Sequence, residues 1–210
     1  MSITQDDIVA VGGDLTLGTL LAAYRRGVFP WPVEGLPLLW FCPRERALLA
    51  FADLHVGRSL ARARRRTRLR FTVDRAFAAV IRACADTPRP GEPGTWITPE
   101  IFAAYTQLHR LGVAHSVEAW RDDALVAGVY GVDVDGAFAA ESMFRREPDA
   151  SKLALLHLIE HLHAGGLDWL DVQVMTPHLE RLGARNVPRA AFLALLARTR
   201  ARGLRPFARA

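Results

Sequence analysis

The sequence is poor in the features by which many proteins are classified. It contains only two cysteines, Cys42 and Cys84, and neither belongs to a C-x-x-C pair, so we expect neither a zinc ribbon nor a disulfide framework. No apolar run reaches the roughly 20 residues that a membrane helix needs, and the first residues lack the basic and apolar regions of a signal peptide. We therefore expect a cytoplasmic protein that makes no contact with a membrane and keeps its thiols reduced.

Motifs for phosphate binding, nucleophilic catalysis and metal binding are missing as well. The sequence has no G-x-x-x-x-G-K-[ST] loop and no G-x-S-x-G turn. His157 and His161 are four residues apart in HLIEHLH, but Glu160 does not stand where H-E-x-x-H requires it, and no third ligand is evident. The sequence therefore predicts no metal and no cofactor.

Lysine is almost absent from a chain that is otherwise basic. Lys152 is the only lysine among 27 basic residues, and the formal net charge is +5. Arginines cluster in residues 58–70, and a helical spacing of three and four places four of them on one face: Arg58, Arg62, Arg65 and Arg66. Because the guanidinium fork binds phosphates, this face favours a nucleic-acid partner. A solvated basic helix is the alternative.

Length and composition divide the chain into two parts. With 210 residues, half of them hydrophobic, the chain can form a moderate domain that carries a small second one. Residues 1–44 are dense in glycine, proline and aromatic residues, and we interpret them as a small N-terminal domain. Residues 45–210 form the larger domain.

The larger domain mixes helical and strand patterns. Strands are predicted at 69–74, 114–120, 124–134, 137–144 and 167–174, and helices at 58–67, 75–86, 98–111, 149–166, 176–184 and 188–203. A further short helix is predicted at 16–26, and a loop rich in proline and glycine at 87–96. The class is α+β. The order strand–strand–strand–helix–strand–helix is similar to the N-acetyltransferase-like fold, which places an amine beside an activated acyl group, but a fold alone does not fix a function.

Two strands end in polar residues. Glu141 ends the apolar run AFAAE, where a carboxylate is costly unless it is paired, so it is either a site carboxylate or a partner of Arg145 or Arg146. In LDWLDVQV, Asp171 and Gln173 are two residues apart and so share one face of a strand. They are suited to hold and orient an attacking amine. The alternative is a polar sheet edge whose hydrogen bonds are satisfied within the protein.

Aromatic residues and one methionine are candidates for a pocket: Trp31, Trp96, Tyr105 and Met143. Trp31 and Trp96 stand in segments with glycine and proline, and aromatic residues in such segments often line pockets. The alternative is ordinary packing, which we favour for Trp40.

A series of blocks, in this order, resembles one family. VGGDLTLGTLLAAYRRGVFPW, EPGTWIT, AHSVEAW, GVYGV, ESMF, ASK and DVQV resemble the bacterial leucyl/phenylalanyl-tRNA–protein transferases, over about residues 8–195. The resemblance implies a small N-terminal domain, an N-acetyltransferase-like catalytic domain, and transfer of Leu or Phe, with Met as a third candidate. The donor would be an aminoacyl-tRNA and the acceptors would be proteins that begin with Arg or Lys. The product would be an N-degron, a signal for protein degradation, made without coenzyme A or a metal.

The resemblance also implies roles for the candidate residues. Asp171, Gln173 and Glu141 match the polar cluster at the reaction centre. The pocket for the transferred side chain and the terminal adenosine is matched by Trp31, Trp96, Tyr105, Val129 and Met143, and the basic patch for the tRNA acceptor stem by Arg58, Arg62, Arg65 and Arg66. Two positions depart from the family pattern, because Val129 stands where Met is frequent and Ala140 where Gly is frequent.

We expect Asp171 to accept a hydrogen bond from the acceptor amine, directly or through Gln173, either as the base or only to position the amine. Glu141 would orient this polar centre and pair with the incoming cationic terminus. One alternative, a CoA-dependent N-acyltransferase, usually has a Gly-rich pyrophosphate loop, whereas the matching segment RREPDASK has no glycine. The other, a non-catalytic RNA-binding protein, leaves the polar cluster without a role.

Overall fold

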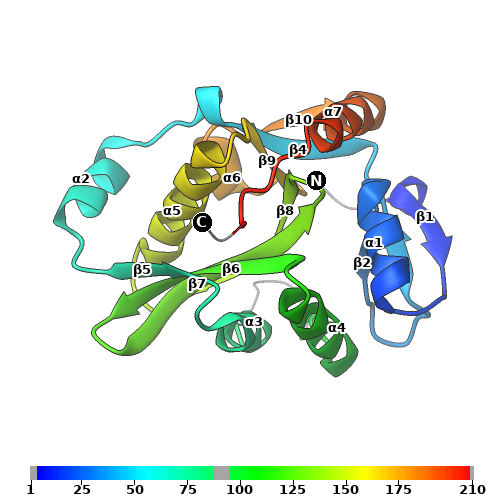
Figure 1. The fold of residues 1–210 in the computed structure, drawn as a ribbon, viewed down its shortest axis with the longest axis horizontal. Coiled ribbons are helices and arrows are strands. Elements are labelled where there is room, and N and C mark those ends of the chain that lie inside the picture. The colour runs from blue at the N-terminus through cyan, green and yellow to red at the C-terminus, as the bar shows by residue number, and fades with distance from the viewer. Residues whose placement is uncertain (1–3, 88–94, 209–210) are drawn as a thin grey trace.

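The computed structural model describes residues 4–87 and 95–208, which form two antiparallel or mixed sheets with helices packed around them (Figure 1). The first sheet has the order β1-β3-β2 and is built from residues 8–41. Its strands are β1 (Ile8–Val11), β2 (Phe29–Trp31) and β3 (Leu39–Phe41), and helix α1 (Leu17–Arg25) joins β1 to β2. Most of the predicted loop 87–96 lies outside the described residues.

The second sheet has seven strands in the order β10-β4-β9-β8-β7-β6-β5. Its strands are β4 (Glu45–Ala50), β5 (Arg70–Val73), β6 (Ala114–Arg121), β7 (Ala124–Val134), β8 (Ala137–Arg145), β9 (Trp169–Gln173) and β10 (Arg185–Pro188). All neighbouring strands pair antiparallel except β8 and β9, which are parallel. The five predicted strands are confirmed as β5, β6, β7, β8 and β9, whereas β4 and β10 were not predicted.

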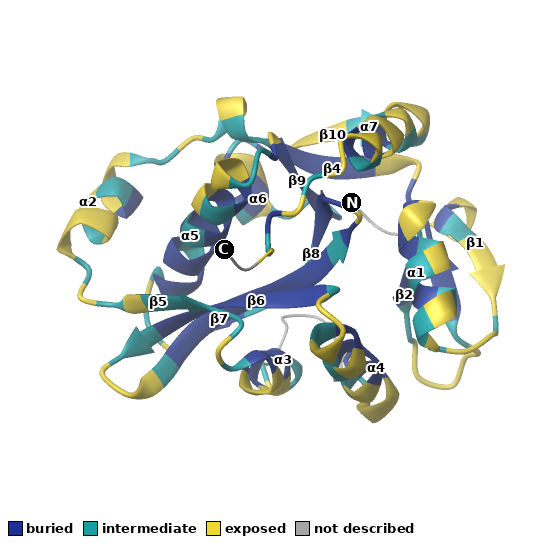
Figure 2. Ribbon diagram, viewed as in Figure 1, coloured by how far each residue is buried: buried dark blue, intermediate teal, exposed yellow. Residues whose placement is uncertain are grey.

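The helices cover both faces of this sheet. They are α2 (Arg58–Arg66), α3 (Phe77–Ala85), α4 (Pro99–Arg110), α5 (Ala150–Ala164), α6 (Pro177–Arg181) and α7 (Arg189–Ala201). Helix α5 lies against one face, and α3 and α4 lie against the other (Figure 1). Figure 2 shows that the central strands are buried and that the helices are buried mainly on the side that faces the sheet. None of the helices in the described residues combines the length and the hydrophobicity that crossing a membrane requires.

The first sheet module is fastened to the larger sheet by polar as well as apolar contacts. Asp135, in the turn between β7 and β8, accepts hydrogen bonds from Arg25 of α1 at 3.0 Å and from Arg200 of α7 at 2.9 Å. These guanidinium groups, Arg25 first, lower the pKa of Asp135. One carboxylate therefore ties the N-terminal module, the turn and the last helix together.

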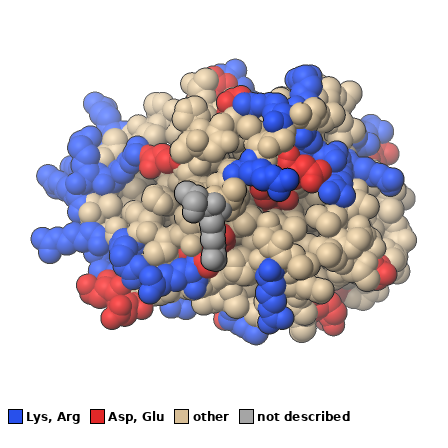
Figure 3. Space-filling model, in the orientation of Figure 1, with Lys and Arg blue, Asp and Glu red and all other residues tan. Residues whose placement is uncertain are grey.

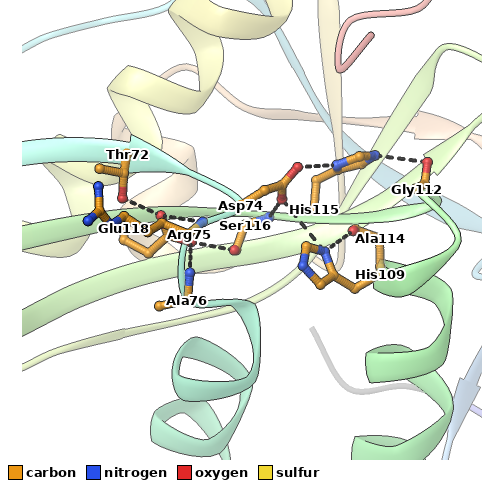
Figure 4. Close-up of polar contacts among 10 residues, drawn as sticks. All are labelled: Thr72, Asp74, Arg75, Ala76, His109, Gly112, Ala114, His115, Ser116 and Glu118. Carbon is orange, nitrogen blue, oxygen red and sulfur yellow. Dashed lines mark hydrogen bonds and ion pairs between the residues drawn. The ribbon is translucent and has the colours of Figure 1, made fainter. Parts of the chain in front are cut away.

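A second polar cluster fixes the edge strand β5 beside β6 (Figure 4). Asp74 follows β5 with a left-handed φ of 59°. Its carboxylate accepts hydrogen bonds from His115 Nδ1 at 2.7 Å and from the Ser116 backbone N–H at 2.9 Å. Glu118, fully buried, accepts a hydrogen bond from the Ala76 N–H at 3.2 Å. Because the half-buried Asp74 and the buried Glu118 both accept hydrogen bonds within this cluster, they hold the start of α3 against the sheet.

Candidate active site

A pocket opens where β8 and β9 separate. These parallel strands pair at Ala139 and Asp171, and the residues that follow on each strand line a cavity of about 380 Å³. Its wall is largely apolar and includes Phe29, Val129, Met143, Leu155, Val172 and Leu179. Its polar groups are Glu141, Ser142, Gln173, Thr176 and His178. An apolar pocket with a few polar groups at one edge is typical of a small-molecule or side-chain site.

Glu141 enters this pocket because β8 contains a bulge. Tyr130 of β7 is opposite Ser142 and Gly131 is opposite Ala140, so Glu141 is the extra residue. The regular alternation of side chains along β8 is therefore interrupted at Glu141. The bulge requires a glycine on the neighbouring strand, since a Cβ at Gly131 would overlap the Ala139 carbonyl oxygen and the Phe138 ring.

The Glu141 carboxyl group ends a chain of hydroxyl groups. Its Oε1 accepts hydrogen bonds from the Tyr24 hydroxyl at 2.6 Å and from Gln173 Nε2 at 2.8 Å. Tyr24 is also hydrogen-bonded to Tyr105, and since the Tyr24 proton goes to Glu141, the Tyr105 hydroxyl is the donor of that bond. Burial of the carboxyl group raises the pKa of Glu141 to about 7, and the bond from Tyr24 opposes this rise. A carboxyl group with this pKa can take up or release a proton near neutral pH.

Gln173 reaches Glu141 from a strained backbone. On β4, Ala47 is opposite Gln173 and Leu48 is opposite Asp171, so β9 bulges at Val172. Gln173 has a φ of 61°, and the Val174 N–H donates to the Val172 carbonyl at 2.7 Å. This is a γ-turn with positive φ, a rare and strained conformation for a residue other than glycine. Such strain persists only where neighbouring groups hold it.

Asp171 helps to stabilise the γ-turn at Gln173. Its side chain does not line the pocket. Its Oδ1 accepts the backbone N–H of Gln173 at 2.9 Å. Both carboxylate oxygens also accept hydrogen bonds from Arg46, at 2.8 Å from Nε and 2.7 Å from Nη2. Asp171 and Arg46 are buried, so this is a bidentate ion pair inside the protein. The predicted common face of Asp171 and Gln173 is interrupted by the γ-turn, and only Gln173 faces the cavity.

The predicted pocket residues fall into two groups. Trp31, Trp96, Val129 and Met143 line the cavity, with the Trp31 and Trp96 rings 6.1 Å apart. Tyr105 was predicted to line it as well, but it is fully buried behind Glu141 and acts through Tyr24.

Sequence reasoning missed several residues of the site, among them Tyr24, Phe29, Arg46 and His178. For Arg46 a signal existed, because an arginine inside the apolar segment ERALLA implies a buried partner.

The predicted basic face forms an exposed patch at one end of the molecule. Arg58, Arg62, Arg65 and Arg66 are all exposed on α2, while Leu60 anchors the helix by its burial. Figure 3 shows Lys and Arg side chains gathered over this end, on the left of the view. The predicted helix is confirmed, and its role remains a prediction.

The histidines of α5 are used in packing. His157 stacks on Phe71 with ring centroids 5.1 Å apart, and His161 lies 4.8 Å from the ring of Phe207. At the start of the same helix, Lys152 pairs with Asp149 at 2.9 Å.

Comparisons with known proteins agree along most of the chain. A family model described as leucyl/phenylalanyl-tRNA protein transferase matches residues 48–197, and one described as the N-terminal domain of that transferase matches residues 13–44. Similar proteins named leucyl/phenylalanyl-tRNA–protein transferase include one from Anaeromyxobacter dehalogenans, 54% identical over 92% of this chain and 83% of that protein. Another, from Myxococcus xanthus, is 51% identical over 92% of this chain and 83% of that protein.

Similar solved structures are more distant. A ribosomal-protein-alanine N-acetyltransferase from Brucella melitensis biovar Abortus is 19% identical, with a TM-score of 0.35, over 52% of this chain and 84% of that one. The L-PGS structure from Bacillus licheniformis is 15% identical, with a TM-score of 0.44, over 77% of this chain and 65% of that one.

Proposed function

Because the chain belongs to the leucyl/phenylalanyl-tRNA protein transferase family, and is thus an enzyme that transfers Leu or Phe from tRNA to protein, we propose its acceptors, its product and the residues that act. The acceptors are proteins that begin with Arg or Lys, and the product is an N-degron made in the cytoplasm. The observation that supports this most directly is the apolar pocket with Glu141 and Gln173 at one edge.

The transferred side chain occupies the cavity between β8 and β9. Most of its wall consists of aliphatic, aromatic and thioether groups, which suit the apolar side chains of Leu and Phe. Met143 and Val129 stand opposite each other on β8 and β7, so they help to set the shape of this wall. Trp31 and Trp96 border the cavity and offer ring faces for the terminal adenine.

The reaction needs placement more than activation. The ester of an aminoacyl-tRNA is already reactive, and correct placement of amine and ester is worth up to roughly 7–11 kcal/mol. The acceptor nitrogen attacks the ester carbonyl carbon, the bond from that carbon to the ribose oxygen breaks, and one amine proton ends on the ribose hydroxyl. Gln173 orients the amine, and Glu141 carries the proton.

Glu141 suits proton transfer better than Asp171. The pKa of Glu141, about 7, is close to the usual pKa of about 7.7–8.0 of an α-amine. Its Oε2 accepts the proton, since Oε1 already receives two hydrogen bonds. Asp171 could accept a proton only by giving up its buried ion pair with Arg46. Of the two roles expected for Asp171, the structure therefore favours positioning.

The distribution of charge supports a cationic acceptor. A second cavity shares Trp31 and Trp96 with the pocket, and its lining includes Asp14, Glu34 and Glu100 but, within residues 4–87 and 95–208, no Lys or Arg. The exposed arginines of α2 lie at the opposite end of the molecule from the N-terminal module (Figures 1 and 3). We assign the phosphates of the acceptor stem to α2 and the acceptor protein to the side of the N-terminal module.

The test uses labelled Leu-tRNA and Phe-tRNA with three peptides that differ only in their first residue, Arg, Lys or Ala. We expect label on the Arg and Lys peptides and none on the Ala peptide. A parallel reaction contains acetyl-CoA in place of charged tRNA. Acetylation there, without transfer from tRNA, would favour the CoA-dependent alternative, and tRNA binding without any transfer would favour the RNA-binding alternative. Equal labelling of all three peptides would overturn the proposed acceptor class.

A further inference from the structure

The guanidinium of Arg46 is enclosed on both faces and along one edge by other side chains, near the candidate active site. It lies between the rings of Phe29 and Phe192, at 4.7 and 4.6 Å from their centroids, and only 1% of the residue is exposed. Two of its nitrogens bind Asp171, while Nη1 has no hydrogen-bond partner among the described residues. A buried ion pair of this kind often contributes no more stability than apolar side chains of the same volume. Because stability does not account for this ion pair, Arg46 is a candidate for a role in the reaction at the neighbouring pocket.

We propose that Arg46 is a positioning residue of the transfer reaction, which fixes the Gln173 amide by orienting the carboxylate of Asp171. This inference rests on the proposed function of the pocket. Asp171 is the link, because one of its oxygens binds both Arg46 Nε and the backbone N–H of Gln173.

The strained turn explains why such a hold is needed. Gln173 keeps its left-handed backbone only while surrounding bonds favour it over an extended strand. Without Arg46 the Asp171 carboxylate loses its bidentate partner, and its hold on the Gln173 N–H weakens. The Gln173 backbone then relaxes, and its side-chain amide moves away from Glu141 Oε1, which it now meets at 2.8 Å.

Arg46 also acts on Glu141 through its charge. Burial raises the pKa of Glu141, and the positive charge of Arg46 opposes that rise. Removing the charge should therefore move the pKa of Glu141 upward. The negative charge of Asp171 acts in the opposite direction and raises the pKa of Glu141, so the two partners of the ion pair oppose each other there.

The experiment compares Arg46→Met and Arg46→Lys with Arg44→Met, in which an exposed arginine two residues away is replaced. Single-turnover transfer of Leu to an Arg peptide is measured at saturating tRNA and peptide, across pH. For Arg46→Met we expect a rate lower on the order of 10²-fold, unchanged KM values, and a pH midpoint shifted upward. Arg46→Lys keeps the charge without the fork, so its rate is intermediate and its midpoint stays in place. Arg44→Met matches the wild type.

Two further measurements separate positioning from folding. The double variant Arg46→Met/Asp171→Asn buries no unpaired charge, so we expect its stability to recover and its rate to remain low. Recovery of the rate together with stability would overturn the proposal.

Hydrogen exchange at the Gln173 backbone N–H reports on the turn without any catalysis. We expect faster exchange in Arg46→Met than in Arg44→Met. If the wild type transferred nothing to any peptide, the proposed acceptor class would fall, and this difference would show only that Arg46 holds the turn at Gln173. Equal exchange in the two variants would overturn the role of Arg46.

Discussion

Glu141 is the residue whose burial bears most directly on the proposed proton transfer. Its carboxyl group is enclosed by Tyr24 and Gln173, and its pKa is raised by burial to about 7. At pH 6 most of the carboxyl groups hold a proton and cannot accept another, whereas at pH 8 most are ionised. Transfer should therefore accelerate between these two values, with one midpoint near 7.

Replacing this carboxyl group tests that assignment. In Glu141→Gln we expect the transfer rate at pH 8 to fall by about 10²- to 10⁴-fold, the usual contribution of a general base. The inflection of the pH–rate profile near pH 7 should vanish. The remaining rise of the rate with pH would come from deprotonation of the acceptor's α-ammonium group. Single-turnover rates from pH 5.5 to 9 provide the measurement.

Glu147→Gln is the matched control, since Glu147 is paired with Arg121 outside the pocket and its pKa is lowered by that hydrogen bond. Its pH profile should match that of the wild type. An inflection near 7 that survived in Glu141→Gln would assign the proton to another group.

At the scale of elements, two bulges on neighbouring strands create the site. The bulge of β8 turns Glu141 inward, and the bulge of β9 at Val172 gives Gln173 its turn. Because β8 and β9 are parallel and separate after Ala139 and Asp171, both side chains meet in the gap that opens between the strands.

The β8 bulge depends on a residue without a side chain. In Gly131→Ala the new methyl group would overlap the Ala139 carbonyl and the Phe138 ring, so β7 and β8 must move apart. We expect a loss of about 1–3 kcal/mol in the free energy of unfolding, as for overpacked cores, and a transfer rate at least tenfold lower. Urea denaturation and single-turnover transfer measure the two effects.

Gly18→Ala in α1 is the control, because nothing lies within 4 Å of its added Cβ. Stability should stay the same or rise slightly. A stable Gly131→Ala variant with full activity would show that the bulge does not set the position of Glu141.

The sequence predicted elements that are defined by local signals. The helices predicted at 98–111 and 149–166 depend on signals within a few positions of each helix, and both are confirmed. Strands β4 and β10 were missed because their partners lie far away in sequence, β9 for β4 and β4 for β10.

The candidate site could be predicted as a set of residues but not as a geometry. Glu141, Gln173, Trp31 and Met143 were identified, and all four line the pocket. The bulges were beyond prediction, since each adds one residue to a strand whose pattern continues on both sides. The separation of Asp171 from the pocket follows from those bulges, so it was beyond prediction too.

At the scale of the whole molecule, exposed Lys and Arg side chains lie on several parts of the surface and gather over the α2 end (Figure 3). The exposed arginines of α2 form one patch, and the acidic second cavity lies beside the N-terminal module. We expect a polyanion to approach from the α2 end, because the arginines there lie close together.

Removing two charges from the patch tests its use. In Arg65→Ala/Arg66→Ala we expect weaker binding of every tRNA alike, and a salt dependence whose slope falls by up to about 0.7–0.9 for each lost phosphate contact. Fluorescence anisotropy of several labelled tRNAs at increasing salt gives the slopes. A defect confined to one tRNA species would contradict contacts to the backbone.

Arg26→Ala/Arg198→Ala is the control for this pair. It removes the same charge from exposed positions in the N-terminal module and α7. Its slope should stay close to that of the wild type. An equal loss in both double variants would mean that net charge, rather than the α2 patch, governs binding.

The position of Arg46 between Phe29 and Phe192 has a consequence for the nascent chain during translation. One ring comes from the first sheet and the other from the last helix, so the guanidinium is enclosed only after synthesis has passed residue 192. A nascent chain can already contain Tyr24, Glu141 and Gln173 while it still lacks Phe192, the second ring that encloses Arg46. If this enclosure sets the geometry of transfer, a nascent chain that ends before residue 192 is inactive, although it already contains the residues of the pocket.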